Sequence, residues 1–141
     1  MIKTNQLPNN ILERIPAAAA YLDSRPDVAF SLLFGSLAKG KQTPLSDVDI
    51  AVYLTHDDEL AQAKMEILGC LNDILGTDEI DLVILNKATL PISMNILKNS
   101  KRLTDRQPHI RHRHLSITMR KYFDYHRNIE SKILTRRYLG G

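Results

Sequence analysis

The chain has 141 residues, of which 43% are apolar and 25% charged, the size and composition of one globular domain. Its formal net charge of +3 is small, and its single cysteine, Cys70, excludes disulfides within the chain and metal sites built from several thiolates. No run approaches the ~18 apolar residues of a membrane span, and acids interrupt the first thirty residues, so we expect a cytoplasmic protein without a secretory segment.

The first predicted elements are a helix and a buried strand. The helix has an asparagine cap at its start and continues to Asp23, but Pro16 removes a backbone hydrogen bond, so we expect it to be bent or broken there. The run Val28–Phe34 is apolar and ends at a glycine, as a buried strand does. We expect residues 36–46 to form a loop.

A strand, a helix and a second strand follow this loop. Residues 47–54 alternate strictly, with apolar side chains at 48, 50, 52 and 54 on one face. Three acids at 57–59 suit a helix N-terminus, and apolar residues then recur every three or four positions until Gly76. Residues 80–85 predict another strand.

The remainder predicts a short helix around 91–98, a small edge strand at 102–104 and a long helix over about 107–139. An apolar stripe runs along the long helix at Leu115, Met119, Tyr122, His126, Ile129 and Ile133, and we expect it to pack on the sheet of its own domain. The fold class is therefore α/β (α+β), a small mixed β-sheet flanked by helices with a long C-terminal helix. We expect a single domain over 1–141, with a core over about 1–104 and a helical arm over about 107–139.

The charge is divided between these two parts. Residues 1–100 hold 8 Lys and Arg against 13 Asp and Glu, whereas residues 101–141 hold 11 against 3, together with four of the five histidines. An acidic core with a basic arm suggests different partners for each. The arm could attract nucleic acid non-specifically. We assign no role to its histidines, and we expect Cys70 to be a small buried hydrophobe in its helix.

Three aspartates form the strongest candidate site. Asp47 and Asp49 are two residues apart on one strand, so their side chains leave the same face with Cα atoms roughly 6.6 Å apart. If the strand at 80–85 is the neighbour, Asp81 adds a third carboxylate about 5 Å away. Three carboxylates repel one another unless a cation lies between them, and Mg²⁺ prefers oxygen ligands and keeps positions open for phosphates.

A candidate phosphate site precedes the acids. Gly35 follows a buried strand directly, where the lack of a Cβ allows close approach to a ligand, and the Ser36 hydroxyl and successive N–H groups can hold phosphate oxygens. Lys39 and Lys41 in the following loop could contact a triphosphate, although loop lysines are more often simply exposed.

Together these motifs resemble a known superfamily. An apolar residue, Gly35-Ser36, ten residues, Asp47-Val48-Asp49-Ile50 and a later Asp81 within an apolar strand are similar to the nucleotidyltransferases related to DNA polymerase beta. The resemblance extends over most of residues 28–139 to the minimal nucleotidyltransferases (MNT), which are typically encoded beside HEPN ribonuclease toxins and act as their antitoxins.

The resemblance implies roles for these residues. Asp47 and Asp49 would bridge two Mg²⁺ ions, and Gly35 and Ser36 would hold the β- and γ-phosphates of ATP. Asp81 would ligate the ion nearest the acceptor hydroxyl, and would lower the pKa of that hydroxyl or take its proton. It also implies transfer of AMP to a tyrosine hydroxyl of the partner HEPN toxin. A core of about a hundred residues leaves no room for an acceptor domain, which agrees with a macromolecular acceptor.

Two other functions remain open at this stage. The chain could be a nucleotidyltransferase that acts on a small hydroxyl compound such as an aminoglycoside. It could also be a non-catalytic antitoxin that neutralises its partner by binding alone through the basic arm.

Overall fold

The computed structural model describes the backbone of residues 7–139 and the side chains of residues 7–129. Its elements follow the chain in the order α1 (Ile11–Ser24), β1 (Val28–Phe34), α2 (Gly35–Ala38), β2 (Val48–Leu54), α3 (Leu60–Leu75), β3 (Ile80–Ile84), the 3-10 turn η1 (Leu85–Lys87), α4 (Leu90–Lys98), β4 (Lys101–Asp105) and α5 (Pro108–Leu139). Every predicted helix and strand is present, with ends shifted by a few residues.

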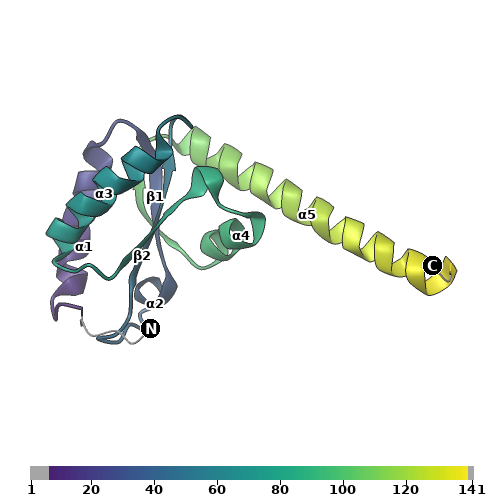
Figure 1. Ribbon diagram of the computed structural model, residues 1–141, viewed down its shortest axis with the longest axis horizontal. Coiled ribbons are helices and arrows are strands. Elements are labelled where there is room, and N and C mark those ends of the chain that lie inside the picture. The colour runs from purple at the N-terminus through teal and green to yellow at the C-terminus, as the bar shows by residue number, and fades with distance from the viewer. Residues whose placement is uncertain (1–6, 140–141) are drawn as a thin grey trace.

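The four strands form one mixed sheet in the order β3-β2-β1-β4. β1 pairs antiparallel with both β2 and β4, whereas β2 and β3 run parallel. Helices α1 and α3 cover one face of the sheet, and α4 and the start of α5 cover the other (Figure 1). The predicted mixed sheet flanked by helices, with a long C-terminal helix, is thus confirmed.

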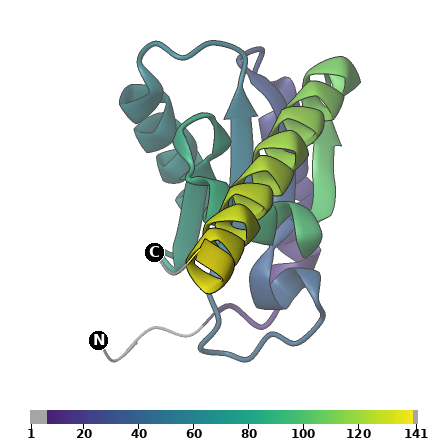
Figure 2. The same ribbon diagram turned by 90° about the vertical axis from the view of Figure 1, so that its right-hand side faces the viewer.

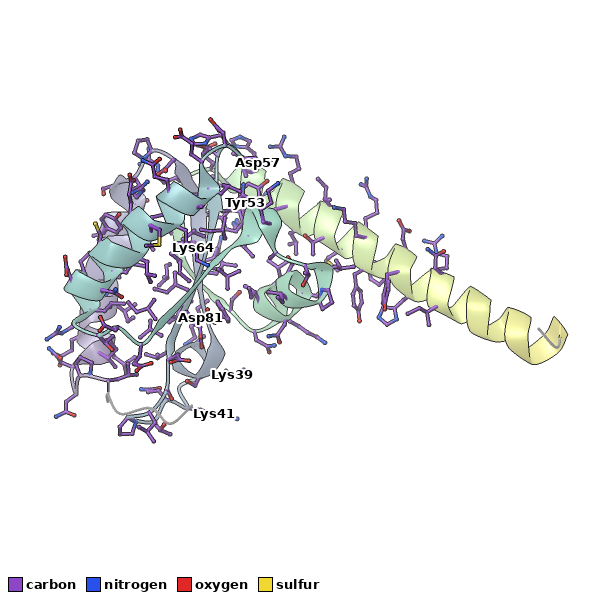
Figure 3. All side chains as sticks on the ribbon, in the orientation of Figure 1. Lys39, Lys41, Tyr53, Asp57, Lys64 and Asp81 are labelled. Atoms are coloured by element: carbon purple, nitrogen blue, oxygen red, sulfur yellow. The ribbon has the colours of Figure 1, made fainter. Side chains whose placement is uncertain are left out.

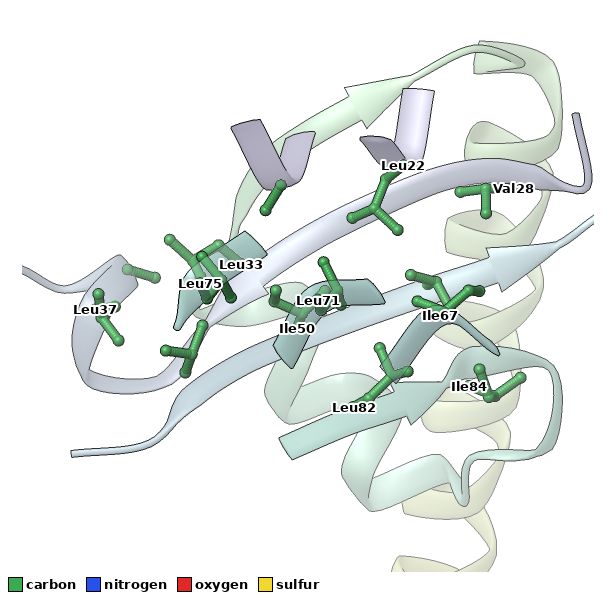
Figure 4. Packing of buried hydrophobic residues seen from close by; sticks show 14 of the residues in the cluster. Leu22, Val28, Leu33, Leu37, Ile50, Ile67, Leu71, Leu75, Leu82 and Ile84 are labelled. Atoms are coloured by element: carbon green, nitrogen blue, oxygen red, sulfur yellow. The ribbon is translucent and has the colours of Figure 1, made fainter. Parts of the chain in front are cut away.

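The alternation of β2 decides which side chains face each helical layer. Val48, Ile50, Val52 and Leu54 lie in the larger hydrophobic cluster, with Ile67, Leu71 and Leu75 of α3 and Leu22 of α1 (Figure 4). The other face holds a smaller cluster in which Ala51 and Tyr53 meet Phe30, Leu85, Ile96 and Ile110. Because side chains alternate along a strand, Asp49 shares this second face with Ala51 and Tyr53.

The entry helix differs from the prediction. α1 is one helix with Pro16 inside it, rather than two segments, because Ile11, Ala18 and Leu22 are buried on either side of the proline. This packing offsets the hydrogen bond that the proline removes. Asn10 does not cap the helix through its side chain; its Oδ1 instead accepts a hydrogen bond from Arg14 Nε at 3.1 Å.

The predicted loop begins with one turn of helix. α2 occupies Gly35–Ala38, and the Lys41 N–H donates to the Ser36 carbonyl at 2.9 Å, which folds the following residues back on that turn. The buried side chains of Leu37 and Ala38 hold the turn against the core. The chain then returns to β2, which begins at Val48, so that Asp47 stands immediately before the strand.

Helix α3 confirms one prediction and corrects another. It ends at Gly76, where φ is +68° and the glycine N–H donates to the Asn72 carbonyl at 2.9 Å. Cys70, however, is exposed, contrary to the predicted buried position. The buried stripe of α3 steps through Ala63, Ile67, Leu71 and Leu75, and Cys70 lies beside that stripe rather than on it.

The basic helix α5 packs on the domain only at its beginning. Ile110 and Thr118 are buried there and His114 is half-buried, whereas Met119, Phe123 and Tyr125 are exposed. Beyond this start the helix projects away from the sheet (Figures 1 and 2). The prediction that the stripe from Leu115 packs on the sheet is therefore wrong, because the helix packs on the domain through residues 110, 114 and 118 instead. Ile133, the last residue of the predicted stripe, lies outside the described side chains.

No helix within residues 7–139 is both long enough and apolar enough to cross a bilayer.

Candidate nucleotidyl-transfer site

The predicted phosphate loop and the first two acids meet where β1 ends and β2 begins. Phe34 is the register partner of Asp49, so Gly35 is carried to the same end of the strand pair as the two acids. Gly35 has φ at +73°, a conformation that L side chains rarely adopt. A Cβ at this position would collide with the Asp49 carboxylate. The backbone of the Gly-Ser turn therefore lies directly against the central acid of the site.

The third acid is brought to the same place by strand pairing. β3 is the parallel neighbour of β2, and Asp81 is the register partner of Asp49. Leu82 and Ile84 lie in the cluster on the α1 and α3 face, so Asp81 and Val83 belong to the other face with Asp49. The conditional expectation that the two strands are neighbours is confirmed. Asp47 and Asp49 are half-buried, whereas Asp81 is exposed.

The donor set suits a hard divalent cation, because all three side chains supply carboxylate oxygens. Register places two of them, Asp49 and Asp81, on one face of adjacent strands. Within the part of the chain that the structure describes, no three Asp, Glu, His or Cys side chains are gathered closely enough to form a ready metal cluster. The roles of Asp47, Asp49 and Asp81 as ligands, and the number of ions, therefore stay predictions.

Two lysines flank the Gly-Ser turn. Lys39 follows the last residue of α2, and its N–H donates to the Gly35 carbonyl at 3.3 Å; Lys41 is two residues further on, and both side chains are exposed. Figure 3 shows Lys39 and Lys41 at one end of the domain, Tyr53 and Asp57 at the other, and Asp81 between them. The predicted contact of the lysines with a triphosphate is compatible with this position and stays a prediction.

A groove beside Asp81 contains residues that the sequence motifs did not indicate. It has a volume of about 410 Å³ and is lined by Lys64 of α3, the β3 segment from Asp81, and Lys87 and Thr89 near the start of α4. β3 pairs only with β2 among the described strands, so its other edge borders this groove. No spacing in the sequence could have associated Lys64 with Asp81, because only the packing of α3 beside β3 brings them together.

The fold and this arrangement of motifs agree with the comparisons with known proteins. A family model described as "Polymerase beta, Nucleotidyltransferase" matches residues 17–109, which is more than half of the chain and includes Gly35, Ser36 and all three aspartates. The chain belongs to this nucleotidyltransferase family. No curated protein matches the sequence significantly.

Several solved structures share the fold of this family member. A chain of a toxin–antitoxin complex with AMP-PNP has a TM-score of 0.69 at 24% identity, and the match covers 84% of this chain and 94% of that chain. The tri-AMPylated Shewanella oneidensis HEPN toxin in complex with MNT antitoxin gives 0.64 at 21%, covering 86% and 94%. The toxin–antitoxin MntA-HepT gives 0.63 at 22%, covering 86% and 95%. At these identities the likeness establishes a shared fold.

Proposed function

We propose that this nucleotidyltransferase is an antitoxin that transfers AMP from ATP to a tyrosine hydroxyl of a cognate HEPN ribonuclease toxin in a Mg²⁺-dependent reaction. The observation that carries the proposal is the contact between the Gly35 backbone and the Asp49 carboxylate. It supports a site in which the Gly-Ser turn would hold phosphate next to an acid that would bind Mg²⁺. The neighbours that share the fold include a complex with AMP-PNP and one with an AMPylated HEPN toxin.

In the proposed reaction, each residue group acts on one part of ATP. The N–H groups and hydroxyl of Gly35-Ser36 hold the β- and γ-phosphates, with Lys39 and Lys41 as further cationic contacts. Asp47 and Asp49 would hold two Mg²⁺ ions, with Asp81 on one of them; bound Mg²⁺ neutralises the triphosphate and stabilises charge on the attacking and leaving oxygens. The carboxylates would hold the cations, and the Gly-Ser turn would hold the phosphates by hydrogen bonds.

The bond changes follow from this placement. The tyrosine oxygen attacks the α-phosphorus in line, its bond to phosphorus forms, and the bond from phosphorus to the bridging oxygen of pyrophosphate breaks. Asp81 receives the hydroxyl proton, and pyrophosphate leaves toward the Gly-Ser turn. The exposed position of Asp81 beside the groove with Lys64 and Lys87 leaves its side chain accessible to a protein acceptor.

The test is label transfer from α-labelled ATP to the HEPN toxin that is the proposed partner of this chain. We expect Mg²⁺-dependent labelling that falls at least 100-fold in the Asp47→Asn, Asp49→Asn double variant. Asp73→Asn, on the exposed side of α3, is the matched control and should retain the wild-type rate. Labelling that survives the double substitution would contradict the proposed site.

A second arm separates catalysis from binding. If the Asp47→Asn, Asp49→Asn variant still neutralises the toxin in cells, the binding-only antitoxin is favoured. If wild-type protein labels an aminoglycoside-type alcohol but not the toxin, the acceptor assignment is wrong while the transferase chemistry stands.

A further inference from the structure

A second cavity lies on the same face of the sheet as the proposed site, at the other end of β2. It has a volume of about 310 Å³ and lies among the end of β2, η1, α4 and α5. Its polar lining comes from Tyr53, Asn86, Ser93, Arg113, His114 and Lys121. A cavity of this size is at the lower end of the range for small-molecule sites and can hold a ligand of about nucleoside monophosphate size.

The charged side chains that line this cavity are all positive. Arg113 and Lys121 are exposed at its edge and bring two positive charges from the same helix, α5. None of the eleven described residues that line it is acidic. The nearest carboxylate in the hydrogen-bond network, Asp57, is outside the lining and accepts a bond from Asn86 Nδ2 at 2.9 Å. The cavity is therefore suited to an anion.

His114 gives a second, independent sign of a ligand. Its Nδ1 atom is buried and has no hydrogen-bond partner among the residues that the structure describes, an arrangement that is unfavourable unless a ligand supplies the partner. Burial, with a smaller effect of the Lys121 charge, lowers the pKa of His114 below its ordinary value. The imidazole is thus held uncharged at neutral pH, beside two cations, with one ring nitrogen unsatisfied.

The remaining lining provides a non-polar wall and hydroxyl groups. Leu85, Leu90 and Ile117 line the cavity together with the Tyr53 ring, whose centroid lies 5.1 Å from that of His114. Ser93 and Thr118 are buried and contribute hydroxyls. An aromatic and aliphatic lining in the same cavity as cationic groups matches a ligand with a flat apolar part and a phosphate.

The cavity is separate from the proposed transfer site. Tyr53 follows Asp49 by four residues on β2, which is about 13 Å of strand. Figure 3 shows Tyr53 at the end of the domain opposite Lys39 and Lys41, with Asp81 between them. None of the residues proposed for ATP or Mg²⁺ lines it.

We propose that this cavity is a second ligand site that binds a nucleoside monophosphate, with its phosphate on Arg113, Lys121 and His114 and its base against Tyr53 and the aliphatic wall. A nucleoside monophosphate and inorganic phosphate share the anionic group that the cationic residues would bind. The apolar wall adds a preference for the ligand that also carries a nucleoside. The proposal does not depend on AMP transfer to a toxin.

The experiment is calorimetric titration of full-length protein carrying Asp47→Asn and Asp49→Asn, without Mg²⁺, with AMP, inorganic phosphate and adenosine. We expect saturable one-to-one binding of AMP, at least tenfold weaker binding of phosphate, and no binding of adenosine. Loss of AMP binding in this variant would overturn the proposal, since AMP would then occupy the transfer site. Phosphate or adenosine binding as tight as AMP would overturn it too.

Two matched double variants, each of which removes two positive charges, distinguish binding of AMP in the cavity from non-specific electrostatic attraction of AMP to the basic helix. Arg113→Gln with Lys121→Gln should weaken AMP binding at least tenfold, whereas Arg120→Gln with Arg127→Gln, an equal charge loss on the same helix outside the cavity, should change it less than twofold. In the same titration followed by NMR, the pKa of His114 should rise on AMP binding. Equal weakening in both variants, or a His114 signal that does not respond, would overturn the proposal.

Discussion

Two independent physical constraints require a glycine at position 35. Its φ of +73° is unfavourable for any residue with a Cβ, and the space a Cβ would take is filled by the Asp49 carboxylate. Gly40, five residues later, has a similar φ of +68°, but a Cβ there would meet no atom within 4 Å. A substitution at Gly40 would therefore cause backbone strain alone, whereas a substitution at Gly35 would cause backbone strain and a collision with the Asp49 carboxylate.

We predict different outcomes for alanine at these positions. Gly35→Ala should displace the Asp49 side chain and lower nucleotidyl transfer at least 100-fold, in addition to backbone strain. Gly40→Ala should cost only the strain of about 1–2 kcal/mol and keep transfer within threefold of wild type. The checks are label-transfer rates and the free energy of unfolding in urea. Equal loss of transfer in both variants would mean that strain alone explains the effect.

The elements are tied together by a few polar contacts outside the hydrophobic clusters. Arg25, after α1, donates from Nε and Nη2 to the two Asp27 carboxylate oxygens at 2.9 and 2.7 Å, and its Nη2 lies 3.3 Å from Glu66 of α3. Ser31 of β1 and Thr104 of β4 share a buried hydroxyl hydrogen bond of 2.7 Å. These contacts fix where α1 ends and how the edge strand is paired.

The Arg25–Asp27 pair predicts an acid-dependent loss of stability. Hydrogen bonds from the Arg25 guanidinium lower the pKa of Asp27 below its ordinary value of 3.8. A carboxyl with a lowered pKa in the folded state contributes stability that is complete above the unfolded pKa and is lost as the pH falls through the folded pKa. The free energy of unfolding of the wild-type protein should thus fall as the pH drops below about 4. In the Asp27→Asn variant, the free energy of unfolding should fall less steeply over the same pH range.

Urea denaturation between pH 2.5 and 6 measures this dependence, with Asp73→Asn as the control for an exposed acid. If Asp27→Asn and Asp73→Asn show the wild-type pH dependence alike, the pair does not contribute in the way described.

At the scale of the molecule, α5 divides into an anchored part and a projecting part. The anchored part is held by the Gln107 N–H bond to the Ala29 carbonyl at 3.1 Å, the Arg111–Asp105 ion pair at 3.0 Å and buried Ile110. The projecting part carries exposed Phe123 and Tyr125 and leaves the body of the protein (Figure 1). This geometry exposes much of the basic arm's helix surface.

We predict that deletion of residues 125–141 leaves the core intact. Because the described side chains from 125 to 128 are exposed, the free energy of unfolding should change by less than about 1 kcal/mol. Ile110→Ala, by contrast, removes a buried side chain and should cost about 2–5 kcal/mol. Thermal and urea unfolding compare the two; a truncation as costly as Ile110→Ala would show that the projecting part packs on the core.

The sequence was sufficient for most of the secondary structure, because helices and strands depend largely on local patterns, although the turn of helix α2 lies where a loop was expected. The strict alternation of residues 47–54 predicted which face carries Asp49, and Gly76 predicted the end of α3. The predicted burial of Cys70 and a break at Pro16 were both wrong for one reason: burial on the sheet, rather than intrinsic propensity, decides whether a helix continues and which of its residues lie inside.

The sequence by itself determined a family, a pair of acids two residues apart and a Gly-Ser turn, since these are short-range spacings along the chain. Only the tertiary structure decided that β3 is the parallel neighbour that sets Asp81 beside Asp49, that Gly35 touches the Asp49 carboxylate, and that α5 leaves the domain after its first turns. It also created the cavity of Tyr53, Arg113, His114 and Lys121, which joins β2 to a helix far along the chain. Strand register and helix packing are long-range contacts, and no local spacing encodes them.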